Sequence, residues 1–307
     1  MKILVTGGAG FIGSHIVDAY VAAGHSVEVV DNLSNGHREN LNPKAVFHEL
    51  DITTPGLAGI FERGKFDMVN HLAAQASVSI SVKDPALDAR VNILGAVNLL
   101  ENCVKTGVRK FIFASSGGTV YGPTDRLPAV ETQPFDASSP YGVSKVATEL
   151  YLRVYSSVHK LKYTALRYSN VYGPRQDPHG EAGVVAIFSR KMLSGGKPVI
   201  FGDGLYLRDY VYVGDVVDAN VRALERGDND AFNIGTGTRT STNEVFAVIK
   251  ELTGFAGAEE HVPDRPGDLR DSCLDSRKAG EILGWKPRTS LREGLRETVE
   301  WFRRAKP

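Results

Sequence analysis

The first part of the chain alternates short apolar runs with segments in which apolar residues recur every three or four positions. The segments with helical spacing begin after residue 10, after Asp84-Pro85 and near Tyr141. Strands that alternate with helices favour a parallel sheet covered on both faces. We therefore predict an α/β fold with a doubly wound parallel sheet. The predicted strands are residues 2–6, 26–30, 46–50, 68–72, 110–114 and 163–167.

The regular alternation ends after residue 168, where Pro174, Pro178 and several glycines follow one another. Beyond them the pattern predicts a helix over 184–193, a strand over 199–201, an alternating strand over 208–213, and helices from residue 243. A capping box at Ser290 starts an amphipathic C-terminal helix. We expect a larger domain of residues 1–168 with a returning segment near 207–235. A smaller α/β lobe would comprise residues 169–206 and 236–307.

The composition argues against binding to nucleic acid or membranes and against a disulfide-rich or metal-binding protein. The 307 residues carry 36 lysines and arginines against 36 acidic residues, so no net field would steer the protein to nucleic acid or an anionic membrane. No apolar run is long enough to span a bilayer, and the two cysteines make neither a disulfide framework nor a zinc cluster. The eight histidines show no ligand spacing, so we predict no metal. A cytoplasmic location is expected.

A glycine-rich turn links the first strand to the first helix. Gly7 permits a tight turn, Gly10 lets the backbone approach a pyrophosphate, and Gly13 allows close helix packing. Asp31 ends the second strand, where a carboxylate accepts both adenosine ribose hydroxyls and repels a 2′-phosphate. The pattern predicts a Rossmann-like domain that binds NAD rather than NADP. In the alternative interpretation the turn is purely structural and Asp31 caps the next loop.

The stretch Ser138-Ser139-Pro140 starts a helix that places Tyr141 and Lys145 one turn apart on one face. A free phenol has a pKa of about 10, and lowering it by about three units needs roughly 4 kcal/mol. Lys145 and a second positive charge could supply this and make Tyr141 a base. An ordinary Tyr/Lys pair on a solvated helix face is the alternative.

Several motifs together resemble the extended short-chain dehydrogenase/reductase family, and within it the UDP-galactose (UDP-glucose) 4-epimerases. The resemblance covers nearly the whole chain. It implies tightly bound, recycled NAD that takes hydride from sugar C4, and a 4-keto intermediate that turns over before hydride returns. The motifs are Thr6-Gly7-Gly8-Ala9-Gly10-Phe11-Ile12-Gly13, Asp31-Asn32-Leu33-Ser34, Ser115-Ser116 with Val120-Tyr121-Gly122, Pro140-Tyr141-Gly142-x-Ser144-Lys145, Leu166-Arg167-Tyr168-x-Asn170, Asn170-Val171-Tyr172-Gly173-Pro174-Arg175, Arg208-Asp209-Tyr210-Val211 and Arg265-Pro266-Gly267-Asp268.

The resemblance also implies site residues. Tyr141, Lys145 and Ser116 would be catalytic, with Ser115 the alternative hydroxyl. The substrate contacts would be Ser116, Asn170, Phe201, Arg208, Arg265, Asp268 and Ser272. The cofactor contacts would be Gly7, Gly10, Phe11, Ile12, Gly13, Asp31, Asn32, Asp51, Ile52, Leu72, Ala73, Ala74, Gln75, Asn92, Tyr141, Lys145 and Tyr168.

Within the substrate set, Arg208 and Arg265 would bind the diphosphate, since planar guanidinium donors suit phosphate oxygens. Asp268 would meet the ribose or orient Arg265, and Asn170 would contact the diphosphate. Phe201 would pack on uracil, although a strand phenylalanine can equally be core. The small Ser272 stands where some relatives have a tyrosine, which suggests that UDP-N-acetylhexosamines are accepted too.

Other readings remain open. Gly117-Gly118 replaces the Asp-Glu pair of the family's 4,6-dehydratases, which argues against dehydration. A UDP-glucuronate 4-epimerase or decarboxylase on the same scaffold is an alternative, and a non-catalytic dinucleotide-binding relative is another. By resemblance we expect a homodimer in which the helices that carry Asn92 and Tyr141 pack as a four-helix bundle.

Overall fold

The computed structural model describes residues 1–179, 183–264 and 269–305, which form an α/β structure around one parallel sheet. The seven strands are ordered β11-β6-β5-β4-β1-β2-β3, and every neighbouring pair is parallel. The predicted fold class is confirmed. The strands are β1 Lys2–Thr6, β2 Ser26–Asp31, β3 Val46–Glu49, β4 Met68–His71, β5 Lys110–Ser116, β6 Lys162–Tyr168 and β11 Asp230–Ile234.

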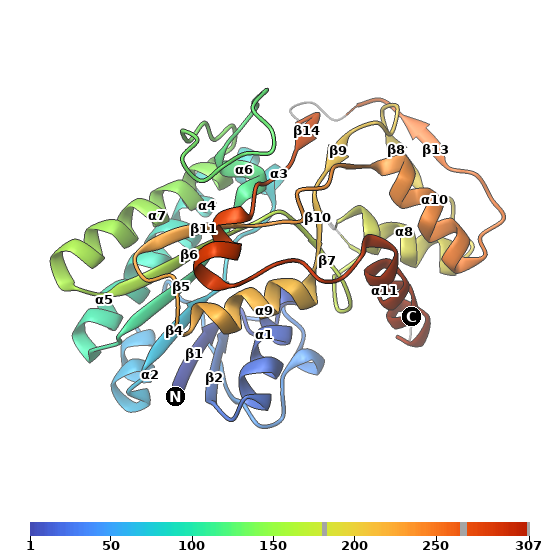
Figure 1. The fold of residues 1–307 in the computed structure, drawn as a ribbon. Helices are drawn as coiled ribbons and strands as arrows, with labels where there is room; N and C mark the ends of the chain where they lie inside the picture. The colour runs from blue at the N-terminus through green and yellow to red at the C-terminus, as the bar shows by residue number, and fades with distance from the viewer. Residues whose placement is uncertain (180–182, 265–268, 306–307) are drawn as a thin grey trace.

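Helices cover both faces of this sheet because strand residues alternate in direction. Ile3 and Val5 pack toward α1 and α9, whereas Leu4 packs in the opposite core with α2, α5 and α7. Figure 1 shows α1 and α9 side by side, although α1 ends at Ala22 and α9 begins only at Val213. The helices are α1 Phe11–Ala22, α9 Val213–Ala223, α2 Leu57–Gly64, α5 Gly95–Thr106 and α7 Pro140–His159.

The chain order places a ligand crevice beside β1. From β1 the chain builds outward to β2 and β3 on one side, and then returns to β4 on the other. Ligands of open parallel sheets bind beyond the carboxyl ends of the strands at such a switch point. The glycine turn after β1 and the loop after β4 therefore meet at this crevice.

The helix predicted after Asp84-Pro85 is not uniform. It consists of α4 Pro85–Asp88, a π-helical segment Ala89–Leu94 and then α5. The widened turn lies at Asn92, where the asparagine side chain bonds to the loop after β4. Such widened turns are frequently found at functional sites.

The single strand predicted over 208–213 is wrong. β9 Leu207–Arg208 joins β12 Thr240–Ser241 and β14 Asp271–Ser272, whereas β10 Tyr210–Tyr212 pairs with β7 Asn170–Tyr172. The break falls at Asp209, whose buried carboxylate accepts hydrogen bonds from Thr236, Gly237 and Leu274. Val213 already belongs to α9, which the sequence did not indicate.

The smaller lobe, on the right of Figure 1, has a core of its own. Phe188, Phe246 and Leu295 pack there, one from each of its three main helices. Residues 279–285 belong by sequence to this lobe, yet Ala279, Leu283 and Trp285 pack in the core of the larger domain. The remaining elements are α3 Val78–Lys83, α6 Gly117–Val120, α8 Val184–Leu193, β8 Val199–Phe201, α10 Thr242–Thr253, β13 Glu260–Val262, α11 Leu291–Arg304, and the short helical turns Arg38–Asn40 and Ala279–Leu283.

Candidate active site

The glycine turn after β1 forms a tight backbone cradle. Gly7 has φ +72°, and a Cβ there would lie 2.6 Å from the backbone nitrogen of Ala73. A Cβ at Gly13 would lie 2.1 Å from the carbonyl oxygen of Gly7. Helix α1 has Gly10 as its N-cap, with no side-chain cap. The helix begins at Phe11, followed by Ile12. Its first backbone N–H groups are thus available to an anion such as a pyrophosphate.

The carboxylate of Asp31 is buried at the end of β2, beside this turn. Its Oδ2 accepts from the backbone of Ala9 at 3.0 Å and its Oδ1 from Leu33 at 2.8 Å. Each oxygen keeps acceptor capacity for a ribose hydroxyl. Asn32 donates to the carboxylate of Asp51 at 2.9 Å, which joins the ends of β2 and β3. These acceptors fit the adenosine half of a dinucleotide.

The loop after β4 is fixed beside the glycine turn. Leu72 and Ala73 both donate from their backbone nitrogens to the carbonyl of Thr6 at 3.1 Å. Asn92 accepts from the Gln75 backbone at 2.8 Å and donates to the Gln75 carbonyl at 2.9 Å. Ala74 lies between these anchored residues, and Ile52 is buried next to Gly95 at the end of β3. The predicted cofactor residues therefore gather at one edge of the sheet.

Tyr141, Lys145 and Ser116 meet at the end of β5. The Nζ atom of Lys145 donates to the Ala114 carbonyl at 2.8 Å and lies 5.4 Å from the centre of the Tyr141 ring. The Ser116 side chain is hydrogen-bonded to Tyr141. Ser115 instead donates to Glu149 at 2.6 Å inside the core. Of the two serines considered, the structure brings Ser116 to the phenol.

Within this chain the phenol of Tyr141 is held protonated. Burial raises its pKa above the ordinary value and Asp88 raises it further, whereas the hydrogen bond from Ser116 lowers it. Burial lowers the pKa of Lys145 to about 8, against the opposing effects of Asp88 and Glu149. Lys145 alone therefore does not make Tyr141 a base at neutral pH. The second positive charge anticipated from the sequence is needed.

Tyr168 differs from the other predicted cofactor residues. Its backbone lies opposite Ser116 in the sheet register, but its side chain is buried in the core against α9. The hydroxyl accepts from Asn220 at 2.8 Å, and burial raises its pKa. Only the backbone of Tyr168 is placed to meet a ligand.

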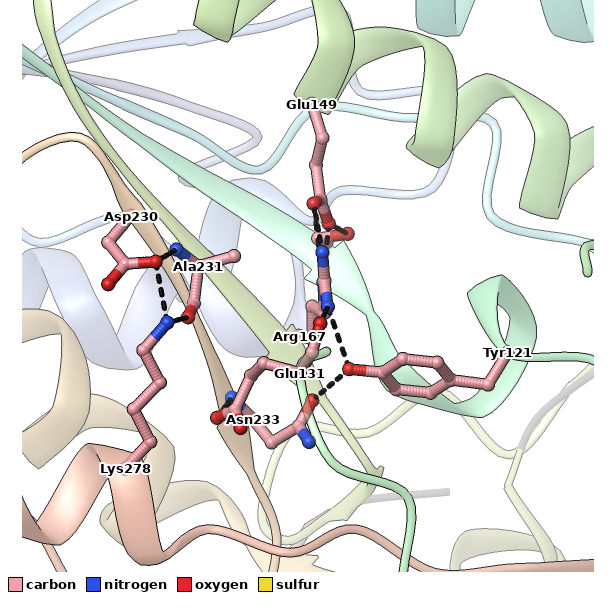
Figure 2. Close-up of polar contacts among 9 residues, drawn as sticks. Tyr121, Glu131, Glu149, Arg167, Asp230, Ala231, Asn233 and Lys278 are labelled. Carbon is pink, nitrogen blue, oxygen red and sulfur yellow. Dashed lines mark hydrogen bonds and ion pairs between the residues drawn. The ribbon is translucent and has the colours of Figure 1, made fainter. Parts of the chain in front are cut away.

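Behind α7, the helix that carries Tyr141 and Lys145, lies a buried polar network (Figure 2). Arg167 bonds to both carboxylate oxygens of Glu149, with Nη2 to Oε2 at 2.6 Å, and donates from Nη1 to the Tyr121 hydroxyl at 2.8 Å. Tyr121 in turn donates to Asn233 of β11 at 2.7 Å. Glu149 is one helical turn beyond Lys145, so the network fixes α7 against β6 and β11. The sequence motifs flagged Tyr121 and Arg167 without giving them a role.

A cavity of about 940 Å³ lies between the lobes, lined by Asn170, Phe201 and Arg208. The guanidinium of Arg208 bonds only to backbone carbonyls, those of Leu207 and Arg270, among the residues described. The guanidinium also lies 5.9 Å from the centre of the Tyr206 ring, and no carboxylate pairs with it in the described part of the chain.

Three other predicted substrate residues are not found at the cavity: one does not line it, and two lie outside the described residues. Ser272 pairs with Arg208 in the strand register but is not among the residues that line the cavity. Arg265 and Asp268 lie outside the described residues. Sequence reasoning missed Val82 and Lys83 of α3 and Lys191 of α8, which also line the cavity. Their apolar and cationic side chains resemble those of any helix surface, so no local signal marked them.

The described part of the chain contains neither a candidate metal site nor a candidate membrane-spanning helix. No group of three His, Cys, Asp or Glu side chains there could hold a metal ion. None of the helices in residues 1–179, 183–264 and 269–305 is long and apolar enough to cross a membrane.

Comparisons with known proteins show the family to which the chain is similar. A model of the "NAD dependent epimerase/dehydratase family" matches residues 3–235. The chain is 55% identical to a UDP-glucose 4-epimerase from Thermotoga maritima solved with UDP-glucose, with a TM-score of 0.97 and coverage of 99% of both chains. It is 47% identical to a Thermus thermophilus UDP-glucose 4-epimerase in complex with NAD, with a TM-score of 0.96 and full coverage of both. It is 37% identical to a UDP-N-acetylglucosamine 4-epimerase from Methanobrevibacter ruminantium, with a TM-score of 0.93 and coverage of 98% and 97%.

Proposed function

Because the chain belongs to the NAD-dependent epimerase/dehydratase family, we propose that it interconverts UDP-glucose and UDP-galactose at sugar C4, with Tyr141, Lys145 and Ser116 as its catalytic residues. NAD, when bound, supplies the acceptor and donor of a hydride. The observation that carries the assignment of residues is the convergence of these three side chains at the end of β5. That point faces the loop after β4, which holds the dinucleotide half of the site.

The chain's own residues handle one proton. With the positive charge of the cofactor nearby, the Tyr141 oxygen would take this proton from the sugar 4-hydroxyl and later return it. Loss of the proton together with the C4 hydride, which the cofactor would accept, would leave a 4-keto sugar between the two transfers. Ser116 shares its hydrogen bond with the same oxygen and keeps the hydroxyl in line. Lys145 supplies a fixed positive charge 5.4 Å from the ring centre. Its hydrogen bond to Ala114 prevents the ammonium from leaving that position.

The cofactor is NAD rather than NADP in this proposal. The carboxylate of Asp31 fits two ribose hydroxyls and opposes a phosphate. Gly7, Gly10 and Gly13, with Phe11 and Ile12 at the start of α1, bind the pyrophosphate. Asn32, Asp51 and Ile52 border adenosine, and Leu72, Ala73, Ala74, Gln75, Asn92 and the Tyr168 backbone border the nicotinamide half.

The cavity between the lobes receives the UDP part of the substrate. Arg208 binds the diphosphate, because its guanidinium is unpaired with any carboxylate among the described residues. Asn170 contacts the same group, and Phe201, which is 38% exposed at the cavity, packs on uracil. Arg265 and Asp268 keep their proposed roles at the diphosphate and ribose.

The substrate range extends to UDP-N-acetylhexosamines in this proposal. Ser272 is small and pairs with Arg208, which lines the cavity. A side chain here that does not itself reach the cavity leaves more room for a 2-acetamido group than a tyrosine would. Ser272→Tyr should lower turnover of UDP-N-acetylglucosamine more than that of UDP-glucose. Equal losses on both sugars would count against the idea.

The quaternary structure is a homodimer. Helix α7 carries an exposed apolar stripe of Val143, Leu150, Tyr151, Val154 and Val158, whose spacing places all five on one face. Leu94, in the helical segment that packs against α7, is also apolar and 61% exposed. An exposed apolar helix face of this kind is typical of an interface. We infer that α5 and α7 of two chains pack as a four-helix bundle. A cytoplasmic location fits the substrate.

Two measurements test the function. Purified protein incubated with UDP-galactose should yield UDP-glucose without added cofactor, and denaturation should release NAD. Tyr141→Phe should release as much NAD but lose turnover by about a thousandfold or more, because the proton acceptor is gone. Product formed by that variant at a near-normal rate would remove Tyr141 from the mechanism.

A further inference from the structure

Asp88 is a fully buried carboxylate at the end of α4, which packs against α7, the helix that carries Tyr141 and Lys145. Its Oδ1 accepts from Ser144, the residue before Lys145, at 2.5 Å. Its Oδ2 accepts from Gln75 at 2.9 Å and from Asn92 at 3.0 Å. Three side-chain donors therefore converge on it from the loop after β4, the π-helical segment and α7.

This environment satisfies a carboxylate by hydrogen bonds but does not neutralise it. No lysine or arginine forms an ion pair with Asp88 in the described part of the chain, in contrast to Glu149, which is paired with Arg167. Burying a charge without an ion-pair partner costs free energy of folding. A functional benefit would have to come from the effect of this charge on nearby ionisable groups. Tyr141 and Lys145 lie on α7 three residues before and one residue after Ser144, which bonds to Asp88, and the Asp88 charge raises the pKa of both.

We propose that the Asp88 carboxylate acts as a positioning residue that keeps a proton on both Tyr141 and Lys145, and so sets the pH range in which the site works. The inference rests on the catalytic roles proposed above. It extends them by assigning a function to a residue that touches neither substrate nor cofactor.

The other charged or titratable groups near the pair cannot perform this task. Glu149 on α7 acts on Lys145, but its charge is balanced by Arg167. His71 on β4 is neutral at ordinary pH, because burial and Lys145 lower its pKa to about 3. Ser116 on β5 carries no charge. Asp88 is thus the uncompensated anion facing both groups among the described residues.

The test uses Asp88→Asn, which removes the charge and nearly keeps the shape. Without the anion, the phenol and the ammonium should both lose their protons at lower pH. The acidic and the alkaline limbs of the kcat/KM profile should therefore move together to lower pH, by about half a unit to one unit. Limbs that stay in place while kcat falls would show a purely structural role and overturn the proposal.

Ser144→Ala is the matched control, because it removes a hydrogen bond to Asp88 without changing any charge. It should lower kcat and leave both limbs where they are. Asp88→Glu, which restores the charge, should return the limbs toward the wild-type positions. If Asp88→Asn fails to fold by circular dichroism, Asp88→Ser serves as the second neutral variant, since water can reach Gln75 and Asn92 beside the smaller side chain.

A spectroscopic readout separates this inference from the proposed function. The ultraviolet phenolate signal of Tyr141 is the difference between each protein and its Tyr141→Phe counterpart during a pH titration. In Asp88→Asn this signal should appear at lower pH than in the wild-type background. An unchanged onset overturns the inference even if the enzyme is active. An inactive wild-type protein sinks the function but still permits this titration.

Discussion

Lys145 donates a hydrogen bond of 2.8 Å to the backbone carbonyl of Ala114, two residues before Ser116 on β5. This bond crosses from α7 to the central sheet and is formed by a buried ammonium. It fixes the distance between the helix that carries Tyr141 and the strand that carries Ser116. The geometry of the proposed catalytic residues thus depends on one side chain and one strand carbonyl.

Activity should fall as the pH rises past about 8, because burial lowers the pKa of Lys145 to about 8 and the mechanism needs its positive charge. Below that pH Lys145 is protonated and the charge is present. Lys145→Arg keeps the charge to much higher pH, since guanidinium does not deprotonate. It should lower kcat but move the alkaline decline upward. A decline at the same pH in this variant would assign it to another group.

Substitution of the two neighbouring serines should have different effects, on turnover for Ser116 and on stability for Ser115. Ser116→Ala removes a hydrogen bond to the reacting phenol, so we expect kcat to fall by about a hundredfold with stability unchanged. Ser115→Ala leaves the buried Glu149 without one donor, so we expect the free energy of unfolding to fall by about 1–3 kcal/mol. Turnover and chemical denaturation of both variants check this. The opposite pattern would make Ser115 the catalytic hydroxyl.

Breaking the buried pair behind the site should destabilise the whole domain. Arg167 and Glu149 are 5% and 6% exposed, and Arg167→Met would leave the carboxylate buried without its cation. We expect unfolding to become easier by about 3–5 kcal/mol. The control is Arg109→Met, which removes an exposed pair with Asp67 and should change stability by about 0–1 kcal/mol. Denaturant midpoints compare the two, and equal losses would contradict the argument.

The sequence predicted the sheet and the dinucleotide half of the site because both depend on local patterns. Gly7 and Gly13 mark a turn in which a Cβ would collide with the backbone, and Asp31 ends a strand with a clear apolar run. Ser116 could be placed by counting from β5, and its contact with Tyr141 agrees with that count.

The rest depended on contacts between distant segments, which no local pattern records. Burial of the phenol and the charge of Asp88 decide the state of Tyr141, and they come from α4 packing against α7. The pattern at 208–213 reads as one strand, but the buried bonds of Asp209 divide it between two sheets. Likewise, residues 279–285 pack in the core of the larger domain, where the indole N–H of Trp285 donates to the Asp215 carbonyl at 2.8 Å.

Asp209 should matter for substrate binding although it lies behind Arg208. It accepts from the Thr236 backbone at 2.8 Å, from the Gly237 backbone at 3.1 Å and from Leu274 at 3.2 Å, so it ties β9 to the larger domain. Asp209→Asn replaces an acceptor by a donor that faces these N–H groups. We expect KM for the UDP-sugar to rise about tenfold while kcat changes less, because Arg208 loses its fixed position.

Asp203→Asn is the control for that change. Asp203 bonds to Arg270 at the surface of the same lobe and is exposed. Its substitution should leave KM unchanged. If KM rose for both variants, or for neither, Asp209 would not be the residue that holds Arg208 in position.

The exposed stripe on α7 gives a last prediction, which concerns assembly. Val154 and Val158 are 53% and 63% exposed on a helix whose opposite face is fully packed, and they lie one turn apart. In the proposed homodimer, Val154→Glu with Val158→Lys would place charges in a desolvated helix interface, so the variant should be monomeric in sedimentation or light scattering. Ile282→Glu introduces a charge at an apolar residue that is 45% exposed in the turn before Trp285, away from the stripe, and should leave the mass unchanged. A double variant that stays dimeric would show that the two chains meet elsewhere.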